Sequence, residues 1–304
     1  MHQSFYLLLL RRLRANFHRR LGIDSSMGGG SSKRRDSCDS KTSTDTKEVV
    51  ADDVQMDLIQ ASGTGEQFIV RDLLAGGADV HAIDGDGDTA LTAAAYGGHA
   101  SIIKLLLDAG ANLEAKNNSG YTALITAASY GHESIILDLL AAGAKKDATE
   151  QYGNTALMRA TLQGHESCVQ ALLDAGVDKE AKAEGQTALI IASIECQESV
   201  LKALLAAGAD KEAKSADGST ALIYASGHGN DSIVQALIDG GANINAQADD
   251  GMTALILAAS VNNDVVVKVL VSTGADKEVK DKEGKTALDY ASEKNFEAII
   301  AMLK

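Results

Sequence analysis

Residues 87–110 read GDTALTAAAYGGHASIIKLLLDAG, and the pattern of this stretch returns along the chain at a fixed spacing. Its opening, Gly-x-Thr-Ala-Leu, occurs seven times, with the glycine at positions 87, 120, 153, 185, 218, 251 and 284. A second glycine series keeps the same spacing at positions 77, 110, 143, 176, 208, 241 and 274. Each step is 33 residues except one of 32, because one residue is missing between Gly176 and Gly185. A period of this length indicates a repeat protein, and we expect the missing residue to fall in a connector.

Each unit predicts two short helices. Thr89 can cap the first, Ala-rich helix, and a break is expected at Gly98 and His99. The second helix carries one apolar face, made by Ile102, Ile103, Leu106 and Leu107. Gly110 is expected to end that helix in a left-handed conformation.

Neighbouring units must stack, because one helix pair cannot cover its own apolar face. The predicted fold is therefore an all-α repeat solenoid of helix-turn-helix units linked by β-turn or hairpin loops. Residues 54–86 follow the same register without the Thr-Ala-Leu opening and are interpreted as an N-terminal capping unit. Seven further repeats extend to residue 304. The repeat domain then spans 53–304 and contains eight helix pairs.

These residues resemble the ankyrin repeat family. The period, the Gly-x-Thr opening, the Gly164-His165 break and the Gly208-Ala209-Asp210 ending all have counterparts in that family. The chain departs from it in two ways. Ala replaces the usual Pro in each of the seven Thr-Ala-Leu openings. The residue after Leu, usually His, is here Thr92, Ile125, Met158, Ile190, Ile223, Ile256 or Asp289. The fold should survive these changes, but the usual Thr–His hydrogen bond is expected to be absent.

The motifs that suggest chemistry are weak. Asp84, Asp86 and Asp88 have the 1-3-5 spacing of a calcium loop, but the sixth position is Thr89 and the twelfth is Ala95. The interpretation is a solvated turn. In-register histidines indicate a structural role: His99, His132 and His165. Cys168 falls on the apolar face, and Cys196 replaces the break glycine and should be more accessible. We expect no cofactor, no metal and no enzymatic activity.

The charge is unevenly distributed. The net charge is −14. Residues 1–50 contain ten Lys/Arg and five Asp/Glu, or +5, which leaves 18 against 37, or −19, for the remainder. A body this acidic is repelled by phosphate backbones, which argues against nucleic-acid binding. The expected partner is another protein with a neutral or basic surface, and the chain is expected to be a monomer.

The resemblance implies that partners contact the loop tips and the exposed ends of the first helices, which line a concave face. Carrying those family positions onto this chain gives the candidate binding residues Asp86, Asp88, Tyr96, Tyr121, Tyr130, Tyr152, Leu162 and Ile194. The four tyrosines fall in consecutive units. Exposed tyrosine is a common interface anchor, so they form the core of the hypothesis.

Residues 1–26 form a basic leader. Leu9, Leu13 and Phe17 would share one helical face opposite arginines, which resembles a mitochondrial presequence or an interfacial membrane helix. Residues 27–52 are interpreted as a disordered Gly/Ser/Thr-rich linker. Met27 and Gly28 open a competing interpretation, an N-myristoylation site at Gly28 with a second acylation site at Cys38, should translation start at Met27. Residues 1–38 would then hold the chain at a membrane.

The predicted function is a non-enzymatic scaffold or adaptor that recognises another protein. Two alternatives remain open from the sequence. One is a membrane-tethered recruiter, and the other is a targeting or regulatory subunit of a separate enzyme. The expected location is the cytoplasm, with membrane association or mitochondrial import as alternatives. Fold alone does not choose among these roles.

Overall fold

The computed structural model describes residues 58–304. Within this range the regular elements are all helices, and extended pairing is limited to the isolated bridges Thr149–Thr155 and Ala183–Gln186. Residues 58–64 are helical, and the following helices are α3 (Gln67–Ala75), α4 (Ala90–Gly97), α5 (Ala100–Asp108), α6 (Ala123–Tyr130), α7 (Glu133–Ala141), α8 (Ala156–Gln163), α9 (Glu166–Asp174), α10 (Ala188–Ile194), α11 (Glu198–Ala206), α12 (Ala221–His228), α13 (Asp231–Asp239), α14 (Ala254–Ser260), α15 (Asp264–Ser272), α16 (Ala287–Glu293) and α17 (Glu297–Leu303).

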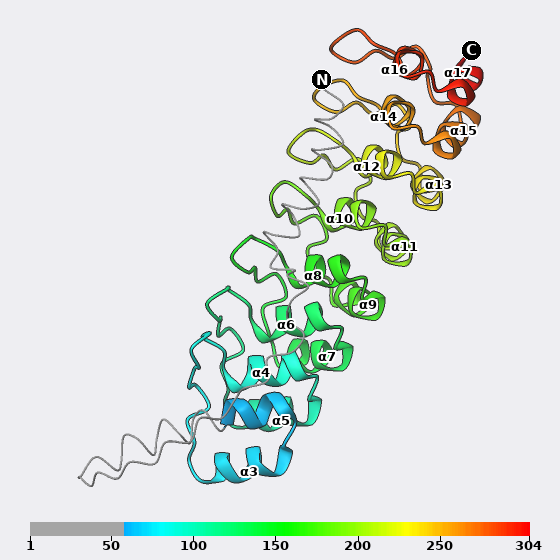
Figure 1. The fold of residues 1–304 in the computed structure, drawn as a ribbon. Helices are drawn as coiled ribbons and strands as arrows, with labels where there is room; N and C mark the ends of the chain where they lie inside the picture. The colour runs from blue at the N-terminus through cyan, green and yellow to red at the C-terminus, as the bar shows by residue number, and fades with distance from the viewer. Residues whose placement is uncertain (1–57) are drawn as a thin grey trace. The chain divides into compact units, whose positions relative to one another are not determined.

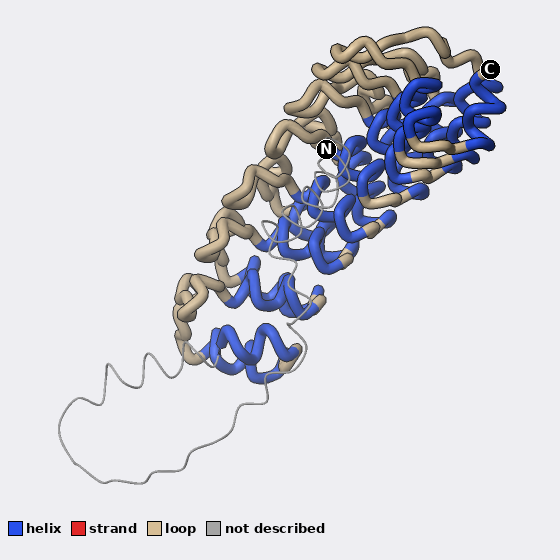
Figure 2. The backbone as a smooth tube through the Cα atoms, turned by 45° about the horizontal axis from the view of Figure 1, so that its top comes forward, coloured by secondary structure: helices blue, strands red, loops and turns tan. Residues whose placement is uncertain are grey.

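The helices stand in a row of eight pairs across residues 58–304, and each pair contacts its sequence neighbours (Figure 1). The first helices of successive pairs carry even numbers from α4 to α16, and each packs on the next. The second helices carry odd numbers from α3 to α17 and do the same. The connecting loops all project from the same side of the row (Figure 2). We call the surface formed by these loops and by the first helices that follow them the loop face. The predicted all-α repeat solenoid is confirmed.

The core follows the predicted apolar faces. Ile102, Ile103 and Leu106 of α5 have no exposed surface, and their equivalents in later second helices are buried in the same way. The first helices contribute small residues, such as Ala94 and Ala95, which are also fully buried and let the backbones approach closely. Cys168 is buried, as expected for a small core residue. Stacking therefore hides the surface that a single pair would expose.

Threonine caps replace the rigid starts that proline would give. Six of the seven Thr side chains before the first helices accept a hydrogen bond from the backbone N–H three residues on; Thr220 is the exception. Two repeats add a reciprocal bond: the Thr92 hydroxyl accepts from Thr89 N at 2.7 Å, and Asp289 Oδ2 accepts from Thr286 N at 2.8 Å. These capping boxes arise at two of the positions where the family has His.

The predicted break between the helices of a pair is a left-handed residue in every full repeat. The residues with positive φ at this position are Gly98, Gly131, Gly164, Cys196, Gly229, Asn262 and Asn295. Glycine adopts this conformation freely and asparagine tolerates it, whereas other side chains pay a steric cost. Cys196, with φ of 56°, is thus the strained member of the series, and it is exposed as predicted.

Replacing Cys196 with glycine is expected to stabilise the chain by about 1 kcal/mol, because it removes the Cβ that crowds the left-handed backbone. Chemical denaturation followed by circular dichroism would measure the change. The reverse substitution, Gly229→Cys, should cost more than this, because its Cβ would also stand 2.9 Å from Asn263 Oδ1. A lower stability for Cys196→Gly would contradict the strain argument.

The three in-register histidines have the structural role that was predicted. The Nε2 atoms of His99, His132 and His165 lie 3.1, 3.1 and 3.2 Å from carbonyl oxygens of the preceding repeat. Those carbonyls belong to Gly63, Tyr96 and Ser129. A carbonyl only accepts, so Nε2 must carry the proton. Asn263 makes the equivalent bond from its side-chain amide to Ser226 O at 2.9 Å.

Polar side chains tie each loop to the next. Five oxygen acceptors at equivalent positions accept a backbone N–H about one repeat further along: Glu114, Asp147, Glu180, Glu212 and Asn245. Three lysines donate Nζ–H to a carbonyl of the following loop: Lys116, Lys182 and Lys214. These bonds between loops fix the loop tips at the spacing of the stacked helices, so side chains on the loop face are held in register.

The missing residue lies in a connector, as predicted. In the loop before α10, Ala183 and Gln186 exchange backbone hydrogen bonds of 3.1 and 2.9 Å. Glu184 and Gly185 between them both have positive φ, 49° and 82°, which is the geometry of a two-residue hairpin turn. The loop before α6 has one residue more, and Asn117 N bonds there to Tyr121 O.

Residues 1–26 and 27–52 lie outside the described residues, so the leader, the linker, Gly28 and Cys38 stay predictions. Residues Val54–Lys304 form one compact unit. In the part from residue 58 onward, every helix is too short or too polar to cross a membrane.

Candidate partner-binding surface

Four tyrosines from three consecutive repeats lie on the loop face. Tyr96 comes from α4 and Tyr130 from the last turn of α6, whereas Tyr121 and Tyr152 come from the loops before α6 and α8. We call these four residues the tyrosine patch. Tyr96, Tyr130 and Tyr152 are 55%, 49% and 37% exposed, and Tyr121 is half-buried. Large side chains with this much exposed surface have apolar area to offer a partner.

Tyr96 and Tyr130 form a packed aromatic pair. Their ring centroids are 4.5 Å apart and the ring planes meet at 69°, an edge-to-face arrangement. The two rings come from neighbouring repeats. Tyr130 stands one position further along its repeat than Tyr96 does in its own. The pair therefore depends on the stacking of α4 against α6. Burial raises the pKa of Tyr130, and the neighbouring Tyr96 and Asp88 act in the same direction.

An arginine that the repeat pattern does not single out lies beneath the patch. Arg159 belongs to α8 and is only 6% exposed. Its Nε donates to Ser129 Oγ at 3.2 Å, and its guanidinium carbon lies 5.1 Å from the centroid of the Tyr121 ring. Burial raises the pKa of Tyr121 to about 12, and the positive charge of Arg159 opposes that rise. Arg159 thus fixes Tyr121 by a cation–π contact between repeats.

The three aspartates of the calcium-like spacing build a turn. Asp84 Oδ1 accepts from the backbone N–H groups of Asp86 and Asp88, each at 2.9 Å. The carboxylate of Asp88 accepts from Asn117 Nδ2 at 3.0 Å, which links it to the next loop. Burial raises the pKa of Asp88, and the charges of Asp84 and Asp86 add to this. Among the described residues no group of three or more His, Cys, Asp or Glu is placed to hold a metal ion.

Glu150 holds the loop at Tyr152 by accepting backbone hydrogen bonds, as Asp84 does in the loop before α4. This carboxylate is 4% exposed; its Oε2 accepts from Tyr152 N at 2.9 Å, and its Oε1 accepts from the side-chain amide of Asn154 at 2.6 Å. The loop tip that carries Tyr152 is therefore held by a buried acceptor rather than by its own ring.

Two of the candidate residues are not surface residues. Leu162 and Ile194 occupy the position of Tyr96 in the third and fourth full repeats, but they are only 6% and 7% exposed. The expectation that they present their side chains to a partner is wrong, because both apolar side chains are buried within the stacked array. Asp86 is exposed and Asp88 is half-buried, so both reach the surface, and Asp88 lies close enough to Tyr130 for its charge to act on that phenol.

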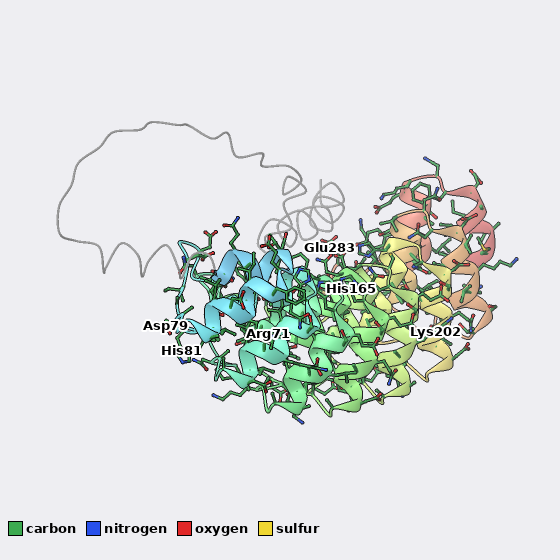
Figure 3. The ribbon with its side chains drawn as sticks, turned by 90° about the horizontal axis from the view of Figure 1, so that it is seen from below. Arg71, Asp79, His81, His165, Lys202 and Glu283 are labelled. Atoms are coloured by element: carbon green, nitrogen blue, oxygen red, sulfur yellow. The ribbon has the colours of Figure 1, made fainter. Side chains whose placement is uncertain are left out.

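The remaining tyrosines of the described part have internal partners. The hydroxyl of Tyr224 donates to the Asp217 carboxylate at 3.1 Å, and that of Tyr290 donates to Asp281 Oδ2 at 2.6 Å. On the opposite side of the molecule, second helices present charged side chains, such as Lys202 of α11, which pairs with Glu198 (Figure 3). Apart from Phe68 of α3, which is 81% exposed, the exposed aromatic side chains of the described part therefore gather on the loop face of the first three full repeats.

Comparison with known proteins identifies the repeats. The family described as ankyrin repeats (3 copies) matches residues 58–150, 136–215, 197–281 and 222–304. The chain belongs to the ankyrin repeat family. The crystal structure of the ankyrin repeat domain of Bcl-3, described as a unique member of the IkappaB protein family, is 33% identical. It matches with a TM-score of 0.65 over 71% of this chain and 99% of the Bcl-3 chain.

The ankyrin assignment gives a general role and leaves the partner open. Ankyrin repeats generally mediate protein–protein interaction, and the fold is typically a non-enzymatic module. No curated protein matched the sequence. By contrast, 522 solved chains match the structure, so the fold is too widely shared to specify what this array binds. The choice of partner must therefore come from the residues that this chain presents at its surface.

Proposed function

We propose that this ankyrin array is a non-enzymatic scaffold or adaptor that binds another protein through the tyrosine patch on its loop face. The observation that carries the proposal is the gathering of Tyr96, Tyr121, Tyr130 and Tyr152, with three of the rings at least 37% exposed. The patch is built on packed helices and tied loops rather than on free side chains. A rigid aromatic surface loses little conformational entropy on binding, which favours an interface anchor.

The family resemblance supports the same surface. In ankyrin arrays the loop tips and first helices form the concave binding face, and the tyrosine patch lies on those elements. The edge-to-face pair of Tyr96 and Tyr130 is the centre of this surface. The surrounding carboxylates, Asp86 and Asp88, would form part of its polar rim.

Affinity capture with a double variant tests the proposal. Tyr96→Ala/Tyr130→Ala removes the two most exposed rings of the patch, neither of which reaches the fully buried core. Its partner should be lost from the captured proteins, while the circular dichroism spectrum and melting temperature stay close to those of the parent chain. Assaying the captured complex for enzymatic activity would reveal a partner that the array regulates.

A second double variant controls for general effects on the array. Val261 occupies the position of Tyr130 in the sixth full repeat, and Glu293 occupies that of Tyr96 in the seventh. Val261→Ala/Glu293→Ala should retain the partner. Capture that is unchanged by loss of the tyrosines, or equally reduced by both double variants, would reject the tyrosine patch as the binding surface.

The sequence at residues 27–38 supports a second candidate function, a membrane-tethered recruiter. We propose that Gly28, exposed by a translation start at Met27, carries a myristoyl group, and that the following basic residues and Cys38 add membrane affinity. The array would then act at a cytoplasmic membrane surface. Cell fractionation of the parent chain and of Gly28→Ala tests this. The intact mass of the native protein must also show a start at residue 28 and the added acyl chain.

A further inference from the structure

We propose that the Tyr96–Tyr130 pair, with Asp88 near it and Asp86 in the same loop as Asp88, receives an arginine or lysine side chain from an extended basic segment of the partner protein. This inference rests on the proposed function and specifies the chemistry of the partner. We call these four residues the acidic–aromatic site.

The aromatic geometry fits a cation. The face of an aromatic ring is electron-rich, and Arg or Lys binds within about 6 Å of a ring centroid. Tyr96 and Tyr130 are about half exposed and meet edge to face, so their ring faces point in different directions and partly toward solvent. A side chain entering there can lie against one face while it contacts the edge of the other.

The charged side chains of the loop before α4 are all carboxylates. Asp86 is exposed, Asp88 is half-buried, and within residues 58–304 neither forms an ion pair with a cationic side chain. The nearby cations are already engaged, because Arg159 is 6% exposed against Tyr121 and Lys116 donates to Thr149 O at 2.6 Å. An incoming cation would relieve the repulsion among the carboxylates of this loop.

The wider charge distribution points the same way. Residues 51–304 carry 18 basic and 37 acidic residues, a net charge of −19, so a basic segment is attracted to the array before it makes contact. Bonds between neighbouring loops also leave the site preformed: Asn118 N donates to Asp86 O at 3.0 Å, and Asn117 holds Asp88. An extended segment that crosses from the loop before α4 toward the C-terminal ends of α4 and α6 would pass the carboxylates and then reach the rings.

The test uses the full chain and three fluorescein-labelled peptides that differ at one residue type. The first carries arginines spaced by glycine and serine; the second replaces arginine with citrulline, which has the same shape and no charge; the third carries glutamate. Fluorescence anisotropy at low ionic strength measures binding. We expect the arginine peptide to bind at least about tenfold more tightly than the citrulline peptide, and the glutamate peptide not to bind.

Variants then locate the site. Tyr130→Leu should weaken binding of the arginine peptide about tenfold, whereas Tyr130→Phe, which keeps the ring, should bind as the parent does. Asp86→Asn should weaken it about threefold. Asp250→Asn is the matched control, because Asp250 is exposed at the equivalent position of the sixth full repeat and its removal changes the net charge equally. That variant should bind unchanged.

The outcomes separate this inference from the proposed function. Equal binding of the arginine and citrulline peptides, absence of binding by the arginine peptide, or equal losses in Asp86→Asn and Asp250→Asn would each overturn the acidic–aromatic site. If the partner were still lost from Tyr96→Ala/Tyr130→Ala, the tyrosine patch would remain the binding surface and its ligand would be neutral. If the tyrosine substitutions changed neither partner capture nor peptide binding, both proposals would be rejected.

Discussion

Replacing Gly120 with alanine is expected to destabilise the array by about 3 kcal/mol, whereas the same change at Gly153 should cost about 1 kcal/mol. Both glycines are left-handed, with φ of 81° and 84°, so both substitutions pay for a Cβ in that conformation. At Gly120 the new Cβ would also stand 2.8 Å from Gln151 N and 3.2 Å from the Glu150 backbone. At Gly153 its nearest neighbours are Ala183 atoms at 3.9 Å, an ordinary contact.

The two positions form a matched pair, since they are one repeat apart and occupy the same place in the unit. Relieving the contact at Gly120 must move the following loop and strain the bond from Gln151 N to Ser119 O. Urea denaturation followed by circular dichroism measures both losses. Because repeat arrays can unfold in parts, hydrogen exchange of the loop amides would show where the array opens. Equal losses at the two positions would mean that backbone strain alone sets the cost.

The arrangement of the helices could be predicted from the sequence because one physical requirement repeats along the chain. Each unit offers the same apolar face, and only stacking on the neighbouring units covers it. The spacing of residues such as Ile102 and Leu106 therefore predicts directly that they are buried. The caps and the left-handed breaks are equally local, since Thr89 and Gly98 act through their own backbone. The in-register histidines could be interpreted as structural for the same reason.

The difference between Gly120 and Gly153 could not be predicted in that way. The sequence shows that a residue is missing before Gly185, but it does not show that the loop folds as a two-residue turn with its backbone held away from Gly153. The position of a residue within the repeat also does not determine how deeply its side chain is buried. Leu162 shares the position of Tyr96 and is buried, because a shorter apolar side chain packs inward where a tyrosine extends to solvent.

The candidate site was only partly predictable for a related reason. The four tyrosines were selected from their register, and three of them are well exposed. Arg159 was missed because a single arginine in an Ala-rich helix resembles a solvated residue. Its contact with Tyr121 and its bond to Ser129 cross from one repeat to the previous one, so they depend on the distance between first helices. The one available signal was its position, where other repeats have Ala93, Thr126 or Ile191.

Raising the pH from about 9 to about 12 is expected to destabilise the array progressively through the phenols of Tyr121, Tyr224 and Tyr290. Burial raises the pKa of Tyr121 to about 12. Burial also raises the pKa of Tyr224 and of Tyr290, and each rise is reinforced by the carboxylate that accepts from the hydroxyl, Asp217 or Asp281. In the unfolded chain all three phenols ionise near pH 10. The folded state holds their protons more tightly.

The sign follows from this difference. Below pH 10 both states are protonated and the stabilisation is complete; above it the unfolded chain loses protons first, so stability falls as the pH rises toward the folded pKa values. For Tyr121 the loss is about 1–2 kcal/mol once the partly exposed ring is allowed for. Urea midpoints at several pH values measure the fall, and phenolate absorbance follows the ionisation. Tyrosines that all ionise near pH 10 in the folded chain would contradict the burial argument.

A double variant isolates the phenols from the lysines, which also lose charge in this range. Tyr224→Phe/Tyr290→Phe keeps both rings and removes both ionisable groups. Each buried hydroxyl makes a hydrogen bond, so the variant should be less stable at neutral pH by about 1 kcal/mol per site. Its stability should nevertheless fall less steeply above pH 10 than that of the parent chain, because the same lysines are present in both. Parallel curves for the two chains would assign the alkaline loss to the lysines that tie the loops, Lys116, Lys182 and Lys214, instead of to the buried tyrosines.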